Sequence, residues 1–162
     1  MEVAAKVGLS EVSTSTWEKT PLRPHYADEF VLQLNTPVKE RPEDWARAIF
    51  GDRPDMGQWF IFQALLHYPL QMQPSPHTVV GWPIAQQTEN WIRLENRSAS
   101  TTCHLLISRD DDKVSLTTLM RYHRRFGKWT WEPLSFIHRR LAPDLLRNAA
   151  RALDPAITQH TP

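Results

Sequence analysis

The stretch TTCHLLISRDDDKVSLTTLMRYH, residues 101–123, carries the clearest structural pattern in the sequence. Both of its halves are rich in residues that favour β-structure, and an acidic run separates them. With a two-residue turn inside that run, Cys103 lies opposite Met120 and Leu105 lies opposite Thr118. This register collects apolar side chains on one shared face, so the stretch predicts an antiparallel hairpin with a defined inner face.

Further elements are predicted on both sides of this hairpin. Alternating apolar residues predict a first strand over 25–34 and two more strands over 78–85 and 90–95. Pro42 at a first helical position and Gly51 at a helix end predict a short helix, because both residues suit those positions. A second helix is predicted over 55–66, where the apolar residues of 59–66 indicate packing from more than one direction.

The last predicted element is an amphipathic helix over residues 134–153. Pro143 lies inside it and is expected to kink the helix or to restart it, because proline removes one backbone donor. Helical spacing places one apolar stripe on a single face and the arginines away from it, so this face is expected to cover the inner face of the sheet. The stripe comprises Leu134, His138, Leu141, Leu145, Asn148, Ala149 and Ala152.

Composition limits the classes of protein to consider. The 162 residues suffice for one domain, predicted over 25–153, between an irregular arm at 1–24 and a flexible tail at 154–162. A net charge of +1 favours no particular partner, and no apolar run is long enough to span a membrane. The start of the sequence does not resemble a secretion signal and Cys103 is the only cysteine, so we expect a cytoplasmic protein.

Several short motifs resemble a known group of proteins. They are HYADEF at 25–30, EDWARAIFG at 43–51, GWPI at 81–84, and Pro133 followed by IHRR at 137–140. Together they are similar to a family of uncharacterised small bacterial proteins near the START-related, Bet v 1-like superfamily, also called SRPBCC, which includes polyketide cyclases. The resemblance implies an α+β helix-grip fold: a curved antiparallel sheet wrapped around a long C-terminal helix, with two short helices after the first strand.

The same resemblance implies a hydrophobic cavity between the sheet and the helix. Members of that superfamily bind lipids, hormones or polyketides, and some catalyse cyclisation, aromatisation or dehydration of what they bind. We therefore expect ligand binding: a small, largely apolar or polyketide-like molecule held in this cavity. A cyclase or dehydratase, a lyase or isomerase using acid–base catalysis without a metal, is the alternative, so whether the chain is an enzyme stays open.

The predicted inner face supplies the candidate site residues. His138 is the candidate acid–base group because imidazole titrates near neutrality, and the Tyr122 phenol is its candidate partner. The remaining candidates form a mostly apolar wall with a few polar groups, which is typical of small-molecule sites. The candidate ligand-binding residues are Ile92, Leu94, Thr101, Cys103, Leu105, Leu116, Thr118, Met120, Leu141 and Leu145.

Other interpretations of these residues remain open. The inner face could be a filled core, and His138 a hydrogen-bonded residue within it. The outer face, with Trp91, Leu106 and Leu119, could serve a protein-interaction module, and exposed edge strands are compatible with a homodimer. We expect neither a cofactor nor a metal, because the histidines show no metal-ligand spacing, and no nucleic-acid partner, because the chain is nearly neutral.

Overall fold

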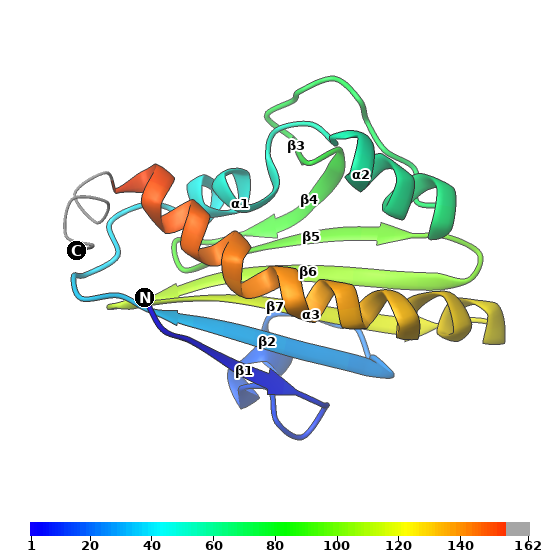
Figure 1. Ribbon diagram of the computed structural model, residues 1–162, viewed down its shortest axis with the longest axis horizontal. Helices are drawn as coiled ribbons and strands as arrows, with labels where there is room; N and C mark the ends of the chain where they lie inside the picture. The colour runs from blue at the N-terminus through cyan, green and yellow to red at the C-terminus, as the bar shows by residue number, and fades with distance from the viewer. Residues whose placement is uncertain (155–162) are drawn as a thin grey trace.

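A seven-stranded antiparallel sheet with strand order β1-β2-β7-β6-β5-β4-β3 forms the centre of the computed structural model, which describes residues 1–154 (Figure 1). A long helix, α3, crosses one face of the sheet, here called the inner face, and confirms the predicted α+β class. The strands are β1 (Val3–Val7), β2 (Tyr26–Gln33), β3 (Thr78–Val79), β4 (Trp82–Gln87), β5 (Trp91–Arg97), β6 (Thr101–Asp110) and β7 (Lys113–Tyr122). The helices are η1 (Thr14–Glu18), α1 (Pro42–Phe50), α2 (Met56–Trp59), η2 (Phe60–Leu65) and α3 (Arg125–Leu153).

The predicted register of the β6–β7 hairpin is confirmed. Cys103 pairs with Met120 and Leu105 with Thr118, and the strands turn after Asp110. On the other side of β6, Ile92 of β5 pairs with Ile107, so the apolar side chains of three strands share the inner face. Leucine, isoleucine and methionine side chains there are almost fully buried, which fixes the register because a one-residue slip would expose them all.

Helix α1 forms as predicted, whereas the second helix differs from the prediction. Pro42 opens α1, and Gly51 ends it with a positive φ of 88°. The Asp55 carboxylate caps α2 by accepting from the Gln58 backbone N–H, but the chain then widens into the π-helical turn η2. None of the side chains of α2 or η2 is fully buried, and Phe60 is exposed, so this segment packs from one side only.

Helix α3 begins at Arg125, nine residues before the predicted start, and continues through both Pro133 and Pro143. Gly127 permits this early start, because a Cβ atom there would lie 2.4 Å from the backbone oxygen of Ser100. The buried side of α3 is also rotated from the predicted stripe. Its most buried residues are Trp131, Ser135, Ala142, Leu146, Ala149 and Ala150, while Leu141, Asn148 and Ala152 are exposed. Most of the buried residues are small, which lets the helix axis lie close to the sheet.

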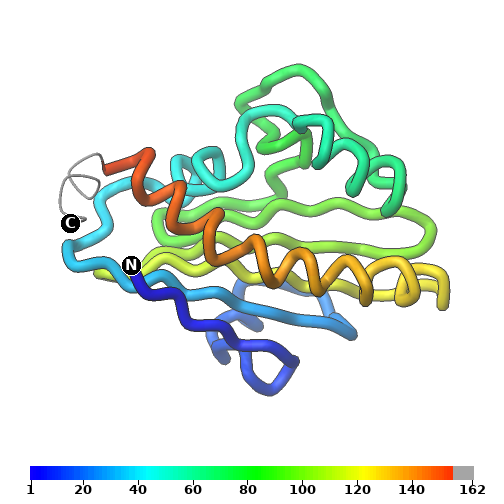
Figure 2. The backbone as a smooth tube through the Cα atoms, in the orientation of Figure 1, coloured from blue at the N-terminus to red at the C-terminus, as the bar shows by residue number. Residues whose placement is uncertain are grey.

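The arm predicted to be irregular over residues 1–24 is part of the fold. Strand β1 extends the sheet by pairing with β2, and the following segment lies across the outer face, opposite α3 (Figure 2). Val12 is buried with Ala27, Leu106 and Leu119 in a second small core. These two leucines are therefore covered by the chain itself and do not form the exposed surface that an interaction module would need. The predicted flexible tail, residues 154–162, lies outside the described residues except for Asp154.

Candidate functional site

An apolar cavity of about 140 Å³ lies between the inner face, α3 and η2. The sheet contributes five side chains, Trp82, Cys103, Leu105, Thr118 and Met120, and α3 contributes six, Trp131, Leu134, Ile137, His138, Leu141 and Leu145. The rest of the wall comes from Phe50, Gln58, Ile61, Phe62, Leu66 and Tyr68. Engineered apolar cavities of roughly 150 Å³ hold one benzene molecule, so this volume suits a single ring or a short branched chain.

A buried carboxylate stands beside this cavity. Asp28 of β2 has no solvent exposure and pairs in register with Thr118 of β7, so both side chains lie on the inner face. The His138 Nε2 atom lies 3.3 Å from both carboxylate oxygens and 3.1 Å from the Thr118 hydroxyl. The Tyr26 hydroxyl donates a hydrogen bond of 2.5 Å to the same carboxylate. Three elements, β2, β7 and α3, thus converge on one polar cluster, defined here as Tyr26, Asp28, Thr118 and His138.

The Tyr26 phenol stays protonated within this cluster. Its pKa is raised above the ordinary range, first by burial and then by the negative charge of Asp28. The Arg139 guanidinium donates to the phenol oxygen at 3.3 Å and to the Ser135 hydroxyl at 3.2 Å, which fixes its position next to the cluster. A neutral phenol bonded to a carboxylate can only donate to it, so Tyr26 supplies one of the hydrogen bonds that a buried carboxylate needs.

The cluster also determines the tautomer that we assign to His138. Because an ionised carboxylate only accepts hydrogen bonds, the neutral imidazole carries its proton on Nε2 and its lone pair on Nδ1. Phe30 and Trp131 pack against the imidazole, with ring centroids 6.1 Å and 5.6 Å away. His138 is thus held in place by both polar and aromatic neighbours at the cavity wall. Such an imidazole can accept a hydrogen bond from a bound molecule or take up its proton.

The structure brings together seven of the twelve predicted site residues. His138, Cys103, Leu105, Thr118, Met120, Leu141 and Leu145 line the cavity. Ile92, Leu94 and Leu116 are buried elsewhere in the same core, and the Thr101 hydroxyl is bonded to the Tyr68 hydroxyl at 2.6 Å. Burial raises the pKa of the Cys103 thiol, so this residue acts as an apolar part of the wall.

Tyr122, the predicted partner of His138, does not line the cavity. Its ring stacks on His25 at a centroid distance of 5.4 Å, and burial together with the charge of Glu132 raises its pKa to about 12. Tyr26 and Asp28 occupy the position next to His138, and neither is among the predicted site residues. One signal for Asp28 was present: it shares the two-residue period of Phe30 and Leu32, which places an acid on an apolar face.

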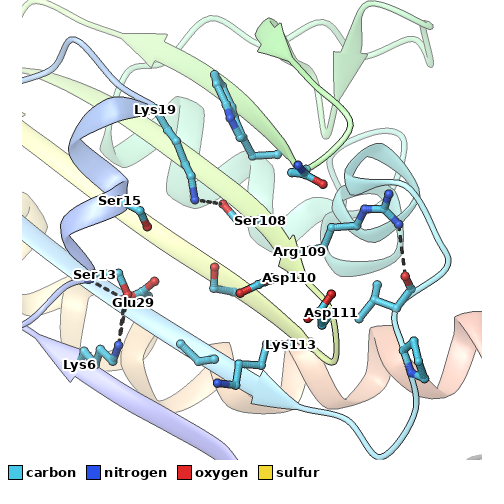
Figure 3. A pocket seen from close by; sticks show the side chains of 16 residues that line it. Lys6, Ser13, Ser15, Lys19, Glu29, Ser108, Arg109, Asp110, Asp111 and Lys113 are labelled. Carbon is cyan, nitrogen blue, oxygen red and sulfur yellow. Dashed lines mark hydrogen bonds and ion pairs between the residues drawn. The ribbon is translucent and has the colours of Figure 1, made fainter.

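A larger, open groove lies on the outer face, between the N-terminal arm and the β6–β7 hairpin (Figure 3). It encloses about 890 Å³, but its charges are largely used within the protein. The Lys19 ammonium donates to the Ser108 hydroxyl at 3.2 Å, and Lys6 lies 3.7 Å from the Glu29 carboxylate. Arg109 binds four backbone carbonyl oxygens. This mixed, internally paired lining favours no single class of ligand, so the apolar cavity under α3 is the stronger candidate site.

Within residues 1–154, no group of three His, Cys, Asp or Glu side chains is arranged to hold a metal ion. In the same range, none of the helices is both long enough and apolar enough to cross a membrane. Comparison with known proteins identified no matching family model, no similar curated protein and no similar solved structure.

Proposed function

We propose that this protein binds a small, largely apolar molecule in the cavity beneath α3, with the polar cluster orienting one polar group of that molecule. The supporting observation is the combination of a mostly apolar cavity with a partly buried imidazole at its wall, which is bonded in turn to a fully buried carboxylate. Apolar area gives affinity in such sites, and a few fixed polar groups give orientation. The element order, a sheet followed by a covering C-terminal helix, supports the helix-grip fold as part of this proposal.

The composition of the cluster favours a ligand-binding role over a purely structural one. Burying the Asp28 carboxylate completely costs free energy that an apolar residue would avoid. His138 lines the cavity and keeps part of its side chain accessible, at 19 % exposure. The cluster is thus stabilised from the sheet and open toward the space that a ligand would fill.

The size of the cavity favours ligands of about one ring, and η2 provides the part of the wall best suited to move. No η2 residue is fully buried, and Ile61 and Phe62 both line the cavity from this segment. A segment with few buried contacts opens at low free energy. A bicyclic or longer ligand would therefore enter by displacing η2, while the sheet and α3 keep their positions.

Catalysis in the same cavity is the second candidate function, and the His138–Asp28 pair is the observation that favours it. A carboxylate 3.3 Å from Nε2 stabilises the imidazolium that forms when Nδ1 takes a proton. Proton transfer by His138 would suit a cyclisation or dehydration of an apolar carbonyl compound. A His138→Gln variant that turns over a verified substrate at the wild-type rate would exclude this role.

Binding is tested with a matched pair of substitutions on α3. Leu145 and Leu153 are both half-buried, but only Leu145 lines the cavity. We expect calorimetry to show that wild-type protein binds 4-methylphenol more tightly than toluene, because only the phenol can hydrogen-bond to the cluster. Leu145→Trp should weaken 4-methylphenol binding at least about ten-fold by filling the space, whereas Leu153→Trp should bind like wild type. Equal affinities in both variants would show that the cavity is not the site.

A further inference from the structure

The N-terminal half of α3 carries a second apolar face that points to solvent. Phe126, Trp129, Phe136, Ile137 and Leu141 are each more than half exposed, Trp129 most of all at 68 %. Their helical spacing places them on one side of α3, away from the buried side. These five residues are called the exposed stripe below. A surface helix normally presents polar side chains there, so five large apolar residues on this face indicate a binding surface.

Basic residues surround the exposed stripe. Between Arg124 and Leu141 the chain has five lysines and arginines and one acid, Glu132, although the whole chain is balanced with 19 basic and 18 acidic residues. Arg124, Arg125, Lys128 and Arg140 are all exposed. The Arg139 guanidinium lies 4.8 Å from the centre of the Phe136 ring, so cation and aromatic ring form one continuous surface. A partner for this region must therefore be apolar and negatively charged.

The exposed stripe is continuous with the cavity. Ile137 and Leu141 belong to the stripe and also line the cavity wall. The loop after η2 lies alongside the start of α3, since the His67 ring stacks on Phe126 at a centroid distance of 6.3 Å. The stripe therefore borders the part of the wall best suited to open, and an apolar molecule leaving the cavity here would emerge onto the stripe.

We propose that the exposed stripe docks peripherally on the surface of an anionic lipid bilayer. Tryptophan and phenylalanine beside lysine and arginine are the residues that place a helix in a membrane interface. The exposed face of a single helix is convex, and such a face can lie against a flat bilayer. A peptide partner would instead need a groove to bind in. The exposed stripe and the basic residues around it support docking by themselves. Transfer of an apolar ligand between the bilayer and the cavity rests in addition on the proposed function.

Vesicle flotation of the full chain tests docking. We expect wild-type protein to float with phosphatidylglycerol vesicles, to bind phosphatidylcholine vesicles at least about ten-fold more weakly, and to lose binding as salt rises. Trp129→Ser with Phe136→Ser should weaken binding to anionic vesicles at least about ten-fold. Trp17→Ser is the matched control, because Trp17 is an exposed tryptophan on η1 and should leave binding unchanged.

A second pair of variants tests the charge contribution. Replacing Arg125 and Arg140 by Gln should weaken binding roughly twenty-five-fold, since each base near an anionic surface contributes about five-fold. Each arginine is also replaced singly and should then cost about five-fold, whereas Lys113→Gln, which removes one positive charge at the β6–β7 turn, should have no effect. The proposal is overturned if the wild-type protein does not float, or if the stripe variants float as well as wild type. If wild type is a dimer that the stripe variants convert to monomer, the surface binds a second copy of the chain instead. Leu145→Trp should still float, so loss of cavity binding and loss of docking are distinguishable.

Discussion

Replacement of Asp28 by Val tests whether the polar cluster exists for stability or for ligand binding. The substitution removes the acceptor that serves the Tyr26 hydroxyl and the His138 imidazole, and Val suits a strand. Both donors would then lie in a largely apolar region without their partner. We expect a large loss of stability from this single change, although Asp28 itself is costly to bury.

The magnitude follows from the number of donors left unpaired. An unsatisfied buried polar group costs about 1–3 kcal/mol, and Asp28→Val takes the carboxylate from two donors. Asp28→Val alone should therefore lower the free energy of unfolding by about 2–6 kcal/mol. Replacing the whole group, with Tyr26→Phe and His138→Leu added, removes the unpaired donors as well, so the triple variant should regain most of that loss.

Urea denaturation at pH 7, followed by tryptophan fluorescence, measures both variants. The midpoint should fall sharply for Asp28→Val and return close to wild type for the triple variant, with an unchanged dependence on urea concentration. A triple variant as unstable as the single variant would contradict a ligand-binding role for the cluster, because the cluster would then contribute stability that apolar packing cannot replace. Asp28→Asn is the control for shape, since it keeps one carbonyl acceptor in a side chain of nearly the same size.

Two further predictions concern residues outside the cavity. Burial and the nearby Arg93 charge lower the pKa of His104 to about 4, against the opposing charge of Glu95, so folding favours neutral His104. This contribution to the free energy of unfolding is complete above about pH 6.5 and is lost as pH falls toward 4, by up to about 3 kcal/mol. Urea denaturation at pH 7.5 and 4.5 should therefore show a smaller loss of stability on acidification for His104→Gln than for wild type. Gly127→Ala should lower the melting temperature through its clash with the Ser100 backbone, although helix propensity alone favours Ala by about 1 kcal/mol; an unchanged or higher melting temperature would contradict this packing.

The sheet was more predictable than the helices because its register is determined by local pattern. The β6–β7 pairing follows from two apolar strands and one acidic turn, all within residues 101–123. The start of α3 was missed because residues 125–133 contain Gly127 and Pro133, which are unfavourable inside an isolated helix. Close packing of Gly127 against the Ser100 carbonyl makes glycine suitable there, and that contact is absent from any local pattern.

The N-terminal arm was missed for a related reason. Strand β1 is short and mostly exposed, so its sequence lacks the alternation that predicts a strand. Its position depends on β2, which offers an unpaired edge, and on the apolar residues Leu106 and Leu119, which need cover on the outer face. The arm is therefore ordered by the sheet that it covers. Its position could be predicted only after the outer face was known to carry leucines that need burial.

The candidate site depends most strongly on contacts distant in sequence. Asp28 and His138 are 110 residues apart, and they meet because β2 pairs with β7 and α3 follows β7 back across the sheet. His138 was predicted on an apolar helix face with Tyr122 as its partner, because Tyr122 faces the same way on the strand before the helix. The strand order gives a different answer: β2 and β7 lie side by side under α3, so their polar residues Asp28 and Thr118 reach the imidazole. An acid that falls in phase with an apolar strand face, as Asp28 does with Phe30, is the sequence feature that identifies such a site before the topology is known.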